Sequence, residues 1–99
     1  MEAMRVEIIT PESQIFQGEA NAISLPGKEG QFQVLENHAP LISTLKAGTV
    51  KIDLPAGGHK VDALHGSIER DKSNDRVLRL PIRGGVAEVQ GNALILLAD

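Results

Sequence analysis

The stretch over residues 26–48, PGKEGQFQVLENHAPLISTLKAG, gathers glycine, proline, lysine and histidine, which are residue types that can hold a phosphate or carry out catalysis. A phosphate-binding loop needs Gly-x-x-x-x-Gly-Lys followed by Ser or Thr, because its backbone N–H groups cradle the phosphates between a strand and a helix. Here Lys28 follows Gly27, but Glu29 comes next and no helical pattern follows. The spacing therefore argues against nucleotide binding and favours a turn between two strands.

His38 is the residue of this stretch best suited to acid–base chemistry, because the pKa of histidine lies near neutrality. A catalytic histidine also needs a nucleophile and an acid that orients its ring. Ser43 and several carboxylates are present, but nothing in the sequence brings them together. We therefore interpret His38 as a structural or interface residue and expect no enzymatic activity from this chain.

Metal binding has little support in the sequence. Zinc sites are built mainly from histidine and cysteine side chains. This chain has no cysteine, and its histidines, His38, His59 and His65, are spread along the sequence. The segment DKSND at 71–75 resembles a calcium loop only in its two aspartates, without the turn glycine or the final bidentate glutamate. We predict no metal and no cofactor.

The composition restricts the class of protein further. The 99 residues fit one domain over 1–99, and the net charge of −3 with only two aromatic residues argues against nucleic-acid binding. No apolar run approaches the roughly 18 residues that a membrane-spanning helix needs. A small, mildly acidic chain without an assembled catalytic group favours an interaction or structural module.

The elements that must position these residues are predicted to be strands. Glycine and proline punctuate the chain at short, regular intervals, which is typical of a sandwich or barrel. The pattern of apolar residues predicts strands over 4–10, 19–25, 49–54 and 76–82, and a hairpin over 85–98 that turns at Gly91-Asn92. The segment 60–70 is ambiguous: its apolar spacing suits a helical turn, but Gly66 weakens that interpretation and favours a long hairpin.

An ordered set of short motifs resembles the N-terminal half of the epsilon subunit of F-type ATP synthases, called delta in mitochondria. Two blocks carry the resemblance, and together they span about two thirds of the chain. The matching motifs are Thr10-Pro11-Glu12, Phe16-Gln17-Gly18-Glu19, Leu25-Pro26-Gly27, Glu29-Gly30, Phe32, Val34-Leu35, His38-Ala39-Pro40-Leu41, Leu45-Lys46-x-Gly48 and the block from Gly84 to Asp99.

The resemblance implies an all-β fold, a β-sandwich of two five-stranded sheets, without the C-terminal helical hairpin that the family usually carries. It also implies a non-catalytic rotor subunit of the central stalk, which links gamma to the c-ring and couples ion translocation to ATP synthesis. Such a subunit is peripheral on the cytoplasmic face of a bacterial inner membrane. It is held there through the synthase complex and does not insert into the bilayer.

Site residues follow from the resemblance by position. Glu29, Gly30 and Gln31 match the family loop that faces the c-ring, and Thr10 and His38 match positions near gamma. Gln31 stands where many members have an acid, so a neutral hydrogen bond replaces any ion pair there.

Two further departures from the family pattern concern the loop before His38 and the middle of the chain. Glu36-Asn37 replaces the usual Pro-Gly, which predicts a differently shaped loop. The segment 55–84 is longer than the family pattern and is expected to form an extended hairpin or insert.

An alternative from another class is a stand-alone β-sandwich that binds a small ligand or a glycan. It is motivated by the fold class alone. Glycan sites usually present exposed aromatic side chains, and this chain has only Phe16 and Phe32. A ligand screen that gave no thermal shift would count against it.

The loop placement generates a first prediction. Replacing Gly30 with Val is expected to impair coupling more than fold stability, because the loop is placed at the c-ring contact. The measurement is ATP-driven ion pumping by the reconstituted synthase, compared with thermal unfolding of the isolated chain. Pumping equal to that of the unmodified protein would contradict the placement.

Overall fold

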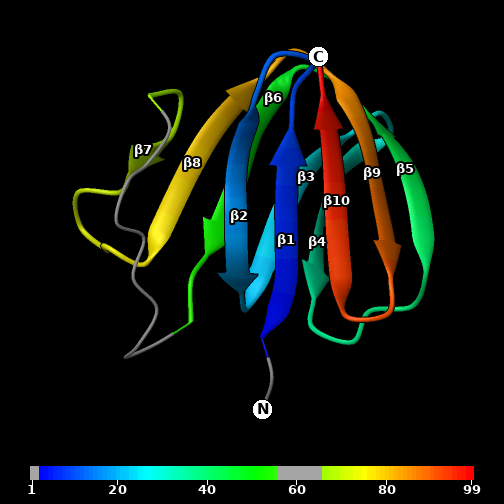
Figure 1. Ribbon diagram of the computed structural model, residues 1–99, viewed down its shortest axis with the longest axis horizontal. Coiled ribbons are helices and arrows are strands. Elements are labelled where there is room, and N and C mark those ends of the chain that lie inside the picture. The colour runs from blue at the N-terminus through cyan, green and yellow to red at the C-terminus, as the bar shows by residue number, and fades with distance from the viewer. Residues whose placement is uncertain (1–2, 56–65) are drawn as a thin grey trace.

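The computed structural model describes residues 3–55 and 66–99, and every regular element in these residues is a β-strand (Figure 1). None of the described residues forms a helix long and apolar enough to cross a membrane. The strands are β1 Met4–Ile9, β2 Gln14–Ala20, β3 Ala22–Gly27, β4 Gly30–Leu35, β5 Leu41–Leu45, β6 Gly48–Asp53, β7 Glu69–Arg70, β8 Val77–Ile82, β9 Gly85–Gln90 and β10 Ala93–Ala98.

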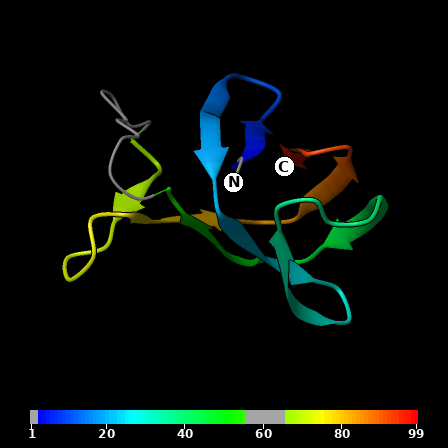
Figure 2. The ribbon, with the colours of Figure 1, turned by 90° about the horizontal axis from the view of Figure 1, so that it is seen from below.

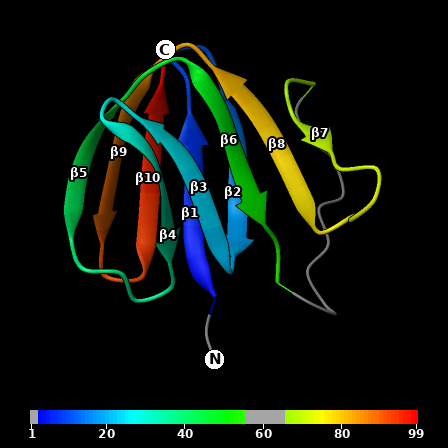
Figure 3. The same cartoon turned by 180° about the vertical axis from the view of Figure 1, so that it is seen from behind.

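The strands form two facing layers that are joined into one curled sheet. The hydrogen-bonded order is β2-β1-β10-β9-β5-β3-β6-β8-β7, with β4 paired to β3. The β5–β3 link consists of the single residue pair Leu45–Gly27, and the sheet folds over there. Figures 1 and 3 show the front layer, β2-β1-β10-β9-β5, and the back layer, β4-β3-β6-β8-β7, from opposite sides, and Figure 2 shows both from below.

The predicted all-β sandwich is therefore confirmed. Its division into two separate five-stranded sheets is not confirmed, because the pairing runs continuously through β5 and β3. The first strand, β1, lies parallel to the last, β10, and antiparallel to β2. This non-local pairing ties both ends of the described chain into the centre of the front layer.

Alternation of apolar residues explains why these segments form half-buried strands. In β1, Met4, Val6 and Ile8 face the core, as the sequence predicts, and in β6 Val50 and Ile52 do the same. The predicted hairpin over 85–98 is also confirmed, with Gly91 at φ 62 in its turn. A positive φ of this kind is readily adopted by glycine.

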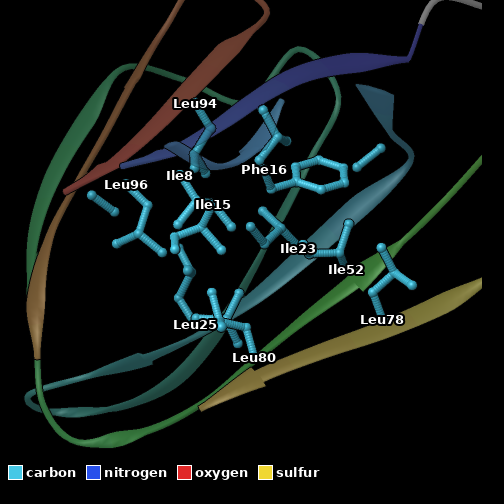
Figure 4. Packing of buried hydrophobic residues seen from close by; sticks show 14 of the residues in the cluster. Ile8, Ile15, Phe16, Ile23, Leu25, Ile52, Leu78, Leu80, Leu94 and Leu96 are labelled. Atoms are coloured by element: carbon cyan, nitrogen blue, oxygen red, sulfur yellow. The ribbon is translucent and has the colours of Figure 1, made fainter. Parts of the chain in front are cut away.

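The core fills the space between the two layers with aliphatic side chains and one phenylalanine (Figure 4). Among the described residues no polar or charged side chain is buried. The largest fully buried side chains are Met4, Ile8, Ile23, Leu25, Ile52, Leu78, Leu94, Leu96, Val6, Val34, Val50 and Val89. Close packing of this kind resists compression.

The predicted strand over 19–25 is wrong, because the chain changes layers at Asn21. Strand β2 ends at Ala20 and β3 begins at Ala22. Ala20 and Ala22 are both buried, and Asn21 between them is exposed. This buried–exposed–buried pattern is the same as in a continuous strand, although the chain changes layers at Asn21. The Asn21 N–H donates to the Asp53 carbonyl at 2.7 Å, which anchors the corner to the end of β6.

The expected extended hairpin over 55–84 is described only in part, because 56–65 lie outside the described residues. The same gap takes in most of the ambiguous segment 60–70. In the remaining part, β7 pairs antiparallel with β8, with Glu69 opposite Arg79. The tight turn 71–76 connects the two strands. This short strand widens the back layer beyond β8.

The core generates a stability prediction that uses two neighbouring leucines of β10. Leu96 is fully buried, whereas Leu97 is 54% exposed on the outer face. Leu96→Ala should lower the free energy of unfolding by about 2–5 kcal/mol, because it leaves a cavity in the core. Leu97→Ala should change it by less than about 0.5 kcal/mol. Urea unfolding of the two variants checks this, and equal losses would contradict the burial described here.

Candidate functional site

The predicted site residues lie at two opposite ends of the sandwich. Thr10 follows β1 at the end that also carries the C-terminus, where it shares a hollow with Arg83 and Asp99. Glu29 lies in the β3–β4 turn, which adjoins that end through the Leu45–Gly27 link. His38 lies in the β4–β5 loop at the other end, where β1 begins (Figures 1 and 3).

The β3–β4 turn owes its shape to two glycines. A Cβ on Gly27 would lie 2.7 Å from the Gly30 carbonyl oxygen and 2.9 Å from the ring of Phe32, so only glycine fits. Gly30 has a φ of +137, a backbone conformation that side chains rarely adopt. Gly30→Val would therefore strain the backbone, at a typical cost of about 1–3 kcal/mol. Gly30→Val would therefore lower stability as well as coupling, and Gln31, exposed in β4, is the cleaner position to change.

An open groove of about 750 Å³ runs between this turn and β5. Its walls come from 27–32 on one side and from Ile42, Ser43 and Thr44 on the other. The Lys28 N–H donates to the Thr44 carbonyl at 3.1 Å and fixes the turn against β5. The groove thus brings Glu29, Gly30 and Gln31 together on a firmly held corner that is open to a partner.

Thr10 and His38 are both held by local hydrogen bonds. The Thr10 hydroxyl oxygen and the Ser13 backbone lie 3.2 Å apart, which closes the β1–β2 loop. The Nδ1 atom of His38 lies 2.6 Å from the Ala39 carbonyl oxygen, and because that oxygen only accepts, the ring donates through Nδ1. The Ser43 hydroxyl donates to the Thr44 carbonyl at 3.4 Å, so the structure does not pair it with His38.

The outer face of the front layer carries exposed apolar side chains that the sequence analysis did not single out. Ile42, Val86, Ile95 and Leu97 are 72%, 40%, 40% and 54% exposed. We call these four residues the apolar face. Leu97 of β10 lies opposite Val86 of β9, whereas Ile95 of β10 and Ile42 of β5 flank the exposed Glu88 of β9.

A sequence signal for the apolar face did exist. Strand β10 reads ALILLA and has apolar residues at its outward positions as well as at its inward ones. In a sheet that buries one face, the outward positions are normally polar. Exposed apolar clusters are typical of surfaces that contact other proteins.

The outer face of the back layer carries one large exposed apolar side chain, Leu35 of β4, which is 53% exposed, and beside it a row of polar residues. The registers place one residue from each strand in a single row across this face, and no member of this row is apolar. From β4 to β7 the row is Gln33, Ser24, Lys51, Arg79 and Glu69. The front layer therefore exposes four large aliphatic side chains, whereas the back layer exposes Leu35 beside this polar row.

The segment weighed as a calcium loop is a hydrogen-bonded turn built on Asp71. One carboxyl oxygen of Asp71 accepts from the Ser73 hydroxyl at 2.7 Å and from the Asn74 N–H at 2.9 Å, and the other pairs with Arg79. The Ser73 and Arg79 bonds hold the pKa of the Asp71 carboxyl well below its usual range. The described residues contain no cluster of three acidic or histidine side chains that would hold a metal.

The described residues thus form a β-sandwich with an exposed apolar cluster on one layer and an open groove at one corner. Residues 3–78 match the family model described as "ATP synthase, Delta/Epsilon chain, beta-sandwich domain", and the chain belongs to this family. The epsilon chain of Chlorobium limicola ATP synthase is 36% identical over 97 residues, covering 98% of this chain and 90% of the relative.

Two further similarities agree with this. The ATP synthase epsilon chain of Nitratiruptor sp. is 49% identical over 57 residues, which span 58% of this chain and 44% of that relative. In the central stalk and c-ring structure of the Tetrahymena thermophila mitochondrial ATP synthase, one chain superposes with a TM-score of 0.70 at 16% identity. That match covers 98% of this chain and 63% of the other. Similarity at this identity supports the fold.

The Asp71 turn generates a prediction about pH. A carboxyl whose pKa is lower in the folded than in the unfolded chain stabilises the fold above the unfolded value of about 3.9, and this contribution is lost as the pH falls toward the folded pKa. The difference in unfolding free energy between the unmodified protein and Asp71→Asn should therefore be largest near pH 6 and should shrink below about pH 4.

Denaturant unfolding at several pH values measures this difference. Asp75→Asn is the matched control, because it removes a charge from the same turn and leaves the Asp71 hydrogen bonds in place. A difference for Asp71→Asn that stays constant from pH 6 to pH 2 would contradict the assignment.

Proposed function

We propose that this chain is a non-catalytic rotor subunit of the central stalk of an F-type ATP synthase. It links the gamma subunit to the c-ring, so that ion translocation is coupled to ATP synthesis. Membership of the delta/epsilon family supports this, and so does the epsilon-chain name of its relatives. A stiff, aliphatic-cored sandwich suits a part that transmits torque without slipping.

The observation that carries the proposal is the apolar face, which we assign to the gamma subunit. An exposed cluster of four large aliphatic side chains on one layer is unusual for a chain that works alone. Thr10 follows β1 and His38 precedes β5, so both loops adjoin the front layer at its opposite ends. A gamma segment lying along this layer would contact both residues and cover the apolar face between them.

The corner formed by Glu29, Gly30 and Gln31 is assigned to the polar loops of the c-ring. Glu29 and Gln31 are exposed, and an open groove lies beside them. Gln31 contributes a neutral amide that both donates and accepts hydrogen bonds. Through these contacts the chain sits peripherally on the cytoplasmic face of a bacterial inner membrane.

The alternative, a ligand- or glycan-binding module, gains no support from the described surface. Phe16 is 5% exposed, and Phe32 packs partly against the core. Phe32 also lines the groove beside the β3–β4 turn, so one partly buried ring is all that the described surface offers to a sugar.

The gamma assignment predicts a loss of binding when a charge is placed on the apolar face. Ile42→Asp should weaken binding to the chain's own gamma subunit about tenfold or more, because a carboxylate would be desolvated in the contact and would lie beside Glu88. Calorimetric titration measures the affinity. Thr49→Asp, on the exposed outer face of β6, is the control and should bind like the unmodified chain.

Two outcomes would contradict the assignment. One is the absence of micromolar or tighter binding by the unmodified chain, which would overturn the rotor function itself. The other is equal binding by Ile42→Asp and Thr49→Asp, which would move the gamma contact away from the apolar face.

A further inference from the structure

The side chain of Asn92 joins three segments that are far apart in the sequence. It lies half-buried in the β9–β10 turn, at the end of the sandwich where β1 begins. Its Oδ1 accepts a hydrogen bond from the Asn37 N–H at 2.9 Å, and its Nδ2 donates to the Ala3 carbonyl at 3.1 Å. The Asn92 carbonyl also accepts from the Arg5 N–H at 2.9 Å, which docks the turn against β1.

The two partners fix the orientation of the Asn92 amide. A backbone N–H can only donate and a backbone carbonyl can only accept, so Oδ1 must face Asn37 and Nδ2 must face Ala3. The residues joined in this way are 55 and 89 positions apart. One amide thus clamps the β4–β5 loop and the start of β1 to the same turn.

The clamped loop needs such an anchor. Residues 36–40 lie between β4 and β5 and belong to no strand. Asn37 has a φ of 60, a left-handed conformation that is uncommon outside glycine and that asparagine tolerates better than most residues. The bond from its N–H to Asn92 favours this conformation, and the next residue is His38.

Asn37 also bears on the expectation raised by the replacement of Pro-Gly with Glu36-Asn37. Glycine at position 37 would take the same φ at no steric cost. Asn37 keeps a φ that glycine would also adopt, and the different loop shape expected from Glu36-Asn37 stays a prediction.

We propose that Asn92 is a positioning residue that holds the His38 loop in the shape that binds the gamma subunit. The inference rests on the proposed function, because it takes His38 as a gamma contact. The sequence analysis gave Asn92 only as a turn residue, and the inference adds that its side chain acts through the Asn37 backbone. Loss of the Asn92 amide should loosen this loop and leave the apolar face intact.

The first test measures the loop without any partner. In Asn92→Ala, the Asn37 amide should exchange its hydrogen with solvent about two- to tenfold faster, which is the effect of losing one net hydrogen bond. In Asn92→Asp, the Asn37 amide should stay protected, because a carboxylate oxygen still accepts from it. Gln90→Ala, in the same hairpin, is the control. An unchanged Asn37 amide in Asn92→Ala would overturn the clamp.

The second test measures binding to gamma by calorimetry. Asn92→Ala should bind about two- to tenfold more weakly than Gln90→Ala, whereas Asn92→Asp should bind like the unmodified chain. If Asn92→Ala does not fold, the Asn92→Asp variant tests the proposal instead. Protection of the Asn37 amide from exchange together with full binding to gamma supports the proposal. Loss of binding in Asn92→Asp with the Asn37 amide still protected overturns it.

The two tests separate this inference from the proposed function. Failure of the unmodified chain to bind gamma would overturn the rotor function, while the exchange measurement would still decide whether the clamp exists. Normal binding by the unmodified chain and by Asn92→Ala alike would overturn only the positioning role.

Discussion

The structure depends on the burial of an aliphatic core between two layers of strands that meet at one narrow link. The core has one buried aromatic ring and, among the described residues, no buried polar side chain, so its stability comes from close packing of branched side chains. The link at Leu45–Gly27 lets a single sheet fold over that core. The front layer is then held together by β1 and β10, the strands nearest the two ends of the chain. These two strands pair in parallel.

This constraint also shapes the surfaces. Once one side of each strand is committed to the core, the other side is free to differ between the layers. The back layer presents a polar row through Lys51 and Arg79, whereas the front layer presents the apolar face. The loops that resemble the family's contact sites project from the edges of this arrangement, and hydrogen bonds within the fold hold each of them.

Local patterns predicted much of the fold from the sequence. The alternation in β1 and β6 and the turn at Gly91-Asn92 gave the right strands, because each signal lies within a few residues. The corner at Asn21 was missed because Ala20 and Ala22 repeat the alternation of a strand through a change of layer.

The candidate site was predicted less completely, for a physical reason. The motif residues were found through their resemblance to a family, but the apolar face exists only when β10, β9 and β5 lie side by side. The bonds of Asn92 to Asn37 and Ala3 likewise join positions that no local pattern connects.

The central claim is that the front layer binds gamma, and cross-linking in the assembled synthase tests it most directly. The chain contains no cysteine, so one introduced thiol is its only attachment point for a short photoactivated cross-linker. We predict that Leu97→Cys, on the apolar face, cross-links to gamma and that Thr49→Cys, on the back layer, does not. Cross-linking of gamma to Thr49→Cys and not to Leu97→Cys would contradict the account.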